Sequence, residues 1–180
     1  VDTELNSADL EYHYSENNEI RVIYYGPESE KESPLVNTVF DDSKTLKIKQ
    51  QNRINVFNMI SGEKVVIYLP AGYDQEIVGD TASGDILFED DMRLDRLSLG
   101  LSSGNVRMGD LVVETADIMV SSGKISANAI KASNYRFKLS SGDIKISELE
   151  GTGEIISTSG DTRIEAYIGG GSIKSTSGSA

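Results

Sequence analysis

The densest group of side chains that could carry chemistry is a run of acids near the middle of the chain, Glu89, Asp90, Asp91 and Asp95. Two carboxylates at a suitable separation can act as general acid and base on a glycosidic bond, so this run is the candidate site of a polysaccharide lyase or hydrolase. The same residues are common in a solvated bend that has no chemical task. We favour the bend, and no catalytic residue is assigned.

Other reactive groups are scarce. His13 is the only histidine and there is no cysteine, which excludes a histidine-based triad, a two-histidine metal site and thiol chemistry within one chain. His13 alternates with Tyr12 and Tyr14, a pattern that predicts an outward position on a strand. No phosphate loop or dinucleotide fingerprint is present, since Gly169-Gly170-Gly171 reads as a bend between strands. We therefore expect no cofactor.

The elements that must position these residues are set by an internal repeat. A Ser-Gly pair returns six times, and the steps between successive glycines are 20, 19, 19, 18 and 18. A period of roughly 20 residues is typical of solenoids, whose units are stable only when stacked on their neighbours. The expected corners of the repeat are Ser83, Gly84, Ser103, Gly104, Ser122, Gly123, Ser141, Gly142, Ser159, Gly160, Ser177 and Gly178.

Apolar residues form columns when the repeats are aligned on the glycine. Two and four residues after it stand, for example, Ile144 and Ile146, and between them lies the polar Lys145. This period of two predicts strands with one buried face, and glycine suits the corner because it adopts positive φ without steric cost. The chain should therefore be all-β, a parallel β-helix or flattened β-roll. Right-handed winding is favoured by analogy with the handedness of crossover connections.

Residues 1–80 lack the repeat but keep the alternation of a β protein. Strands are indicated around 10–14, 20–24, 46–48, 54–56 and 65–69, the last closed by a Pro-Ala-Gly turn. We expect irregular coils or hairpins that cap one domain of residues 1–180, with regular repeats of about 18–20 residues over 81–180. A separate small β domain is the alternative, and the lack of a linker argues against it.

The two ends of the chain carry expectations of their own. The sequence begins at Val1, inside an expected strand and with no visible signal peptide or anchor, as a trimmed or processed product would. It stops in the middle of a corner at Gly178-Ser179-Ala180. Either the natural chain continues, or the last rung is open and allows self-association with another molecule.

Charge narrows the classes of partner. Lys and Arg total 17 against 29 acids, a net charge of −12. Such a balance repels polyanions, so nucleic acid and an anionic membrane surface are disfavoured. No apolar run is long enough to span a bilayer. Calcium would need acidic ligands at every turn, but Lys124 interrupts the column of Asp85, Asp143 and Asp161.

Three stretches resemble a known family. They are the SSGDI and STSGD repeats, VVIYLP at Val65–Pro70 and NSADL at Asn6–Leu10. Together they resemble the putative-adhesin β-strand-repeat family, a bacterial group of largely unknown function that is common in envelope and stress-responsive proteins. The likeness covers nearly the whole chain. It implies a β-helical module outside the cytoplasmic membrane, and it offers no catalytic residues.

The expected function is therefore a non-enzymatic, extracytoplasmic module for adhesion, scaffolding or the envelope-stress response. Its partner would be a protein, a glycan or another envelope component, bound along a flat polar face. The alternative is a carbohydrate-active β-helix that uses the acids of residues 89–95. Tyrosines concentrated before residue 80 could add an aromatic contact patch, namely Tyr12, Tyr14, Tyr24, Tyr25, Tyr68 and Tyr73.

Overall fold

The computed structural model describes residues 1–26, 36–40, 45–50 and 62–179. All regular structure within these ranges is β, without any helix, so the all-β prediction is confirmed. The ten strands belong to one sheet. They are β1 (Asp2–Leu5), β2 (Asp9–Ser15), β3 (Arg21–Tyr25), β4 (Val36–Phe40), β5 (Leu46–Gln50), β6 (Lys64–Pro70), β7 (Glu76–Ser83), β8 (Ile86–Phe88), β9 (Met92–Ser159) and β10 (Thr162–Ser177).

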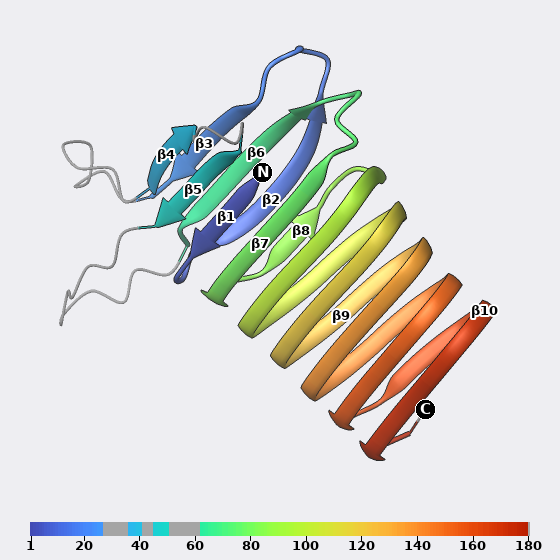
Figure 1. Cartoon of the computed structure of the whole chain (residues 1–180). Helices are drawn as coiled ribbons and strands as arrows, with labels where there is room; N and C mark the ends of the chain where they lie inside the picture. The colour runs from blue at the N-terminus through green and yellow to red at the C-terminus, as the bar shows by residue number, and fades with distance from the viewer. Residues whose placement is uncertain (27–35, 41–44, 51–61, 180) are drawn as a thin grey trace, which may run out of the picture.

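The long strand β9 winds through several coils, and Figure 1 shows these coils stacked into a rod that ends at β10. Neighbouring coils pair in parallel at the spacing of the repeat. Ile77 of β7 lies beside Leu97 of β9, an offset equal to the step from Gly84 to Gly104. Thr162 of β10 lies beside Ile144, and this offset equals the shorter step from Gly142 to Gly160. The fold is therefore solenoid-like, with one repeat to each coil.

The N-terminal strands join the same rod less regularly. Strand β1 pairs in parallel with β7 and β5, and β2 pairs in parallel with β8 and β6. Strands β3 and β4 pair antiparallel with β6 and β5, so the sheet is mixed at this end. These are the irregular coils and hairpin-like pairs that the sequence predicts there. The predicted strand at 54–56 and the charged loop at 27–35 lie outside the described residues.

The core lies inside the coils, where the apolar columns face one another. Ile86, Val106 and Ile125 are each 0% exposed, and Ile118 and Phe137 on the opposite strands are equally buried. Each such side chain contributes about 1.5–3 kcal/mol when it is buried. The columns therefore stabilise the rod along its whole length.

The columns end in the open at β10. Tyr167 and Ile173 occupy inward positions of the repeat, yet each is 40% exposed because no further coil of the described chain covers it. Their counterparts one coil earlier, Leu149 and Ile155, are 0% exposed. The last coil is thus less buried than the coils before it.

The corner glycines stack directly on one another, which explains why glycine returns at this position. Gly123 and Gly142 have φ values of +145° and +120°, a region that only glycine adopts readily. A Cβ on Gly142 would overlap the carbonyl oxygen of Gly123, and a Cβ on Gly123 would overlap that of Gly104. Gly84 differs, because its φ is not in this region and a Cβ there would meet the carbonyl of Ala8 instead.

Candidate functional site

Glu89, Asp90 and Asp91 form the bend between β8 and β9, whereas Asp95 lies within β9, and all four residues are exposed. Asp90 accepts a hydrogen bond from the Tyr14 amide at 2.7 Å, and Asp91 accepts one from the Asp110 amide at 2.9 Å. The carboxylates therefore hold the bend against β2 and against the coil that follows it. No group of three or more acidic or histidine side chains suited to a metal ion occurs among the residues that the structure describes.

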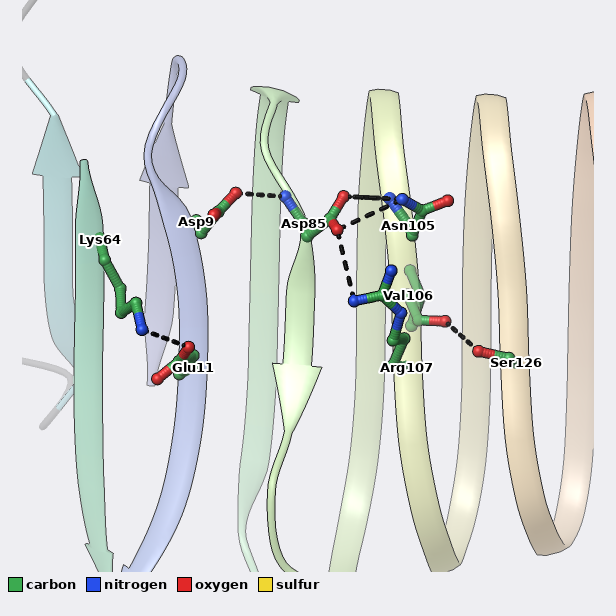
Figure 2. Close-up of polar contacts among 8 residues, drawn as sticks. All are labelled: Asp9, Glu11, Lys64, Asp85, Asn105, Val106, Arg107 and Ser126. Carbon is green, nitrogen blue, oxygen red and sulfur yellow. Dashed lines mark hydrogen bonds and ion pairs between the residues drawn. The ribbon is translucent and has the colours of Figure 1, made fainter. Parts of the chain in front are cut away.

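A second group of polar side chains, most of them carboxylates, lies in the position that follows each corner, and we call it the ladder row. Its members in the structure are Asp9, Asp85, Asn105, Lys124, Asp143 and Asp161. Asp9 accepts the Asp85 amide at 2.8 Å, and Asp85 accepts the Asn105 amide at 2.8 Å (Figure 2). Asp143 accepts the Asp161 amide at 3.0 Å. Each acid thus binds a backbone N–H of the next coil, so the aspartates recur for a structural reason that needs no cation.

The ladder row belongs to a larger polar face, made of the outward side chains of β3, β6, β2, β8 and the strand after each corner. Lys64 pairs with Glu11 at 2.7 Å, and Arg107 reaches Asp85 at 3.7 Å (Figure 2). The hydrogen bond from Lys64 to Glu11 raises the pKa of this lysine. These contacts fix charged groups of both signs in rows along the rod.

At its N-terminal end the polar face carries an aromatic stack that the sequence alone did not reveal. The His13 ring stacks on Tyr68 at 5.2 Å between centroids, and the Arg21 guanidinium lies 4.4 Å from the Tyr68 ring centroid. The three residues come from β2, β6 and β3, which are adjacent in the sheet. The alternation of residues 10–14 correctly predicted that His13 points outward, but nothing in the sequence pairs it with Tyr68.

The six early tyrosines do not form one contact patch. Tyr12 is fully buried and stacks on Phe88 with centroids 4.8 Å apart, and its burial raises the pKa of its hydroxyl. Tyr73 is partly buried, which raises its pKa to about 12. Tyr25 is 50% exposed on the polar face. Of these side chains, Tyr25 is therefore the one best placed to contact a partner.

On the other side of each corner the rod has a second surface, which we call the groove face. It is made of the outward side chains of β5, β1, β7 and the β9 and β10 strands that precede the corners. A groove of about 560 Å³ crosses it, and Asp80, Gly100, Met119 and Lys138 lie along that groove. Burial raises the pKa of Asp80, and the nearby Asp2 and Glu4 raise it further.

These features define a β-solenoid-like domain of stacked coils, whose outer surface carries ordered rows of polar side chains. The model of one protein family, Toastrack DUF4097, matches residues 1–180. The chain belongs to this family. No sequence among curated proteins matches it, and no helix of the described residues is long and apolar enough to cross a membrane.

Solved structures are similar to this chain. A crystal structure of a putative adhesin from Bacteroides fragilis NCTC 9343 aligns over 99% of this chain and 92% of that chain, with a TM-score of 0.57 and 13% identity. A putative adhesin from Parabacteroides merdae ATCC 43184 covers 97% and 91%, with a TM-score of 0.49 and 14% identity. The first likeness shows a common architecture, and the resemblance to the putative-adhesin family expected from the sequence is confirmed.

Proposed function

We propose that the chain is a non-enzymatic binding module of the adhesion, scaffold or envelope-stress kind, acting outside the cytoplasm. The family and the putative adhesins that share the fold support this setting. The polar face would be the contact surface. Its partner would be an extended polymer, such as a glycan or another envelope component, because a long flat face offers many equivalent contacts and little enclosure.

The observation that carries the proposal is the order of the polar face. Its rows are held coil to coil by hydrogen bonds such as that between Asp143 and the Asp161 amide. Adjacent parallel strands lie about 4.8 Å apart, so side chains of one row recur at that interval. A rigid row loses little conformational entropy when a repetitive ligand binds it. The same face has exposed Arg107, Lys145 and Arg163 for acidic or hydroxyl groups of the ligand.

We further propose that the rod is a right-handed parallel β-helix, as the handedness of crossover connections predicts. The parallel pairing of β7, β9 and β10 supports parallel winding. The antiparallel strands β3 and β4 would then be a cap on the first coils. A crystal structure would test the hand directly, and left-handed coils would contradict it.

A binding experiment tests the proposed function. Immobilised protein is exposed to a panel of neutral and acidic glycans and envelope polymers, and binding is measured by interferometry. For a polymer that binds, the double variant Arg107→Ser/Lys145→Ser should weaken binding at least fivefold. Lys131→Ser is the matched control, because Lys131 is an exposed cation away from the polar face that pairs with Glu148 and Glu150. Equal losses in both proteins would contradict the proposed surface.

The carbohydrate-active alternative is separated by the same panel. Reducing ends and unsaturated products are assayed after prolonged incubation with each polysaccharide. We expect none, since Asp90 and Asp91 already accept backbone hydrogen bonds at the bend. Turnover that is abolished by Asp91→Asn or Asp95→Asn would overturn the non-enzymatic proposal.

A further inference from the structure

The groove face carries opposite charge at its two ends. At the N-terminal end Asp2, Glu4 and Asp80 lie beside one another on β1 and β7, and β5 adds Lys47 and Lys49. Three acids and two lysines leave a charge of −1. At the other end Arg136, Lys138 and Lys174 surround Glu154, and three cations with one acid leave +2. The face is therefore a dipole that runs along the rod.

Two charges that flank the centre of this face, Asp80 and Lys138, are unpaired. Asp117 lies between them on the coil of Met119, and one of its carboxylate oxygens is buried without a hydrogen-bond partner. Neither Asp80 nor Lys138 forms an ion pair or hydrogen bond with any residue that the structure describes. The raised pKa of Asp80 has burial and two neighbouring acids as its causes. Since no cation among the described residues of the same copy pairs with the Asp80 carboxylate, this carboxylate is available to a cation of a second copy.

Between these charges the surface has a hollow and a projection. Asp80, Gly100, Met119 and Lys138 each stand four residues before a corner glycine, so they lie in one column on four successive coils. Gly100 has no side chain, and the flexible Asp80 carboxylate leans over the space that a side chain would fill. Met119, one coil further on, is 44% exposed, and its outward neighbours on the same strand, Asp117 and Ser121, are polar.

We propose that two copies of the chain associate through their groove faces with the rods antiparallel, so that Asp80 of each copy pairs with Lys138 of the other. The two copies are related by a two-fold axis that runs parallel to the strands, midway between the coils of Gly100 and Met119. This axis places each column opposite the same column of the other copy and reverses the order of the coils. As Asp80 turns outward to the lysine, Met119 of the other copy enters the space above Gly100. In the next column Ser102 faces Ser121, and two hydroxyls can hydrogen-bond.

The contact is self-complementary, as a two-fold interface requires. The acidic end of one copy covers the basic end of the other, and this occurs twice. Two peripheral rows place like charges opposite one another, with Asp2 facing Glu154 and Lys49 facing Lys174. Glu154 and Lys174 are already bound to each other at 2.6 Å, and Lys49 is bound to Glu4 at 2.6 Å. The repulsion there is therefore reduced.

The size of the face sets the expected affinity. The interface spans the six rows from β1 to the coil of Glu154, which are spaced at about 4.8 Å. With strands of six residues at about 3.3 Å per residue, these rows give a patch of roughly 29 Å by 20 Å. Two copies would bury roughly 1,200 Å² in total, which is the lower limit of specific interfaces. We therefore expect a dissociation constant in the micromolar range that rises with salt concentration.

Cross-linking of the wild-type protein is the first test. Asp80 and Lys138 of one copy are three coils apart, about 14 Å, which is too far for their side chains to meet. A zero-length carbodiimide cross-link between them can form only between copies. We expect this cross-linked peptide in the dimer band at about 100 µM protein. A cross-linked dimer that lacks it would overturn the proposal.

Charge exchange is the second test, read by sedimentation velocity over a range of concentrations. Asp80→Lys and Lys138→Asp should each weaken the dimer at least tenfold, and the double variant should recover most of that loss. Lys145→Asp on the polar face is the control and should have no effect. A wild-type protein that stays monomeric at about 500 µM would overturn the proposal. So would a dimer that survives both single changes but is lost on Ile168→Asp, since the open coil β10 would then be the interface.

Discussion

Replacing one corner glycine by alanine tests the stacking that organises the whole rod. Gly142 has a φ of +120°, in a region that costs a residue with a side chain about 1–3 kcal/mol. The added Cβ would also overlap the carbonyl oxygen of Gly123. A backbone atom cannot turn away, so the two coils must separate, and a few hydrogen bonds worth about 1 kcal/mol each are weakened. We expect Gly142→Ala to lose about 3–5 kcal/mol.

Two matched variants isolate the cause. Gly178 has a similar φ and a similar overlap, with the carbonyl of Gly160, but it lies in the last coil, which can shift outward. Gly178→Ala should therefore lose only the backbone strain, about 1–3 kcal/mol. Gly72 has open space around it and an ordinary φ, so Gly72→Ala should stay within about 0.5 kcal/mol.

The assay is thermal unfolding followed by circular dichroism, with urea unfolding as a check. For a chain of this length, 1 kcal/mol lowers Tm by about 2–4 °C, so Gly142→Ala should melt roughly 6–20 °C below the wild type. The order of the losses is the critical result. Direct stacking of the corners is not what requires glycine if Gly142→Ala has the same Tm as Gly72→Ala. The same holds if Gly178→Ala has the lowest Tm of the three variants.

Three further changes test the core, the ladder row and the groove. Ile144→Asp should lose at least about 4 kcal/mol, because Ile144 is 1% exposed and a buried charge has no partner; Lys145→Asp should stay within about 0.5 kcal/mol, and equal melting points would refute the inward column. Asp143→Ala removes the acceptor of the Asp161 amide and should cost about 1 kcal/mol in urea unfolding, with Asp143→Asn recovering most of it. Asp80→Asn should raise the Tm of the dilute monomer at neutral pH, since the raised pKa of Asp80 means that its charged form destabilises the folded state. This gain in Tm should fade as the pH falls through the folded pKa towards the ordinary value of 3.8. A gain that grows in acid would refute the direction of the pKa shift.

The regular half of the fold was predictable because the repeat and the alternation agree there. The period of the glycines fixes which residues stack, and period two fixes which face inward. Ile125 and Ile144 are therefore predicted as neighbours in the core, and both are buried. The hydrogen bond between Asp91 and Asp110, 19 residues apart, also follows the period and could have been found from the sequence.

The irregular half was less accessible for the same physical reason. The stack of Arg21, Tyr68 and His13 depends on β3 pairing antiparallel with β6 and β2 pairing parallel with it. No repeat sets those registers, so they depend on loop lengths and packing. The bond from the Tyr14 amide to Asp90 spans 76 residues, and no local pattern indicates it. The groove needed the structure as well, because no sequence pattern indicates that the Asp80 carboxylate leans over Gly100.

The direct contact between successive corner glycines has a consequence for how such a rod can evolve in length. Each coil meets its neighbours through the same corner, the same ladder row and the same inward columns. A duplicated segment of one repeat would find its pairing partners already in place and lengthen the molecule by about 5 Å. An insertion of one or two residues within a paired strand would instead shift the columns, although the steps of 18 to 20 residues between corner glycines show that such differences are accommodated elsewhere in a coil. Growth and shortening by whole repeats is therefore the mutational route that the architecture tolerates best.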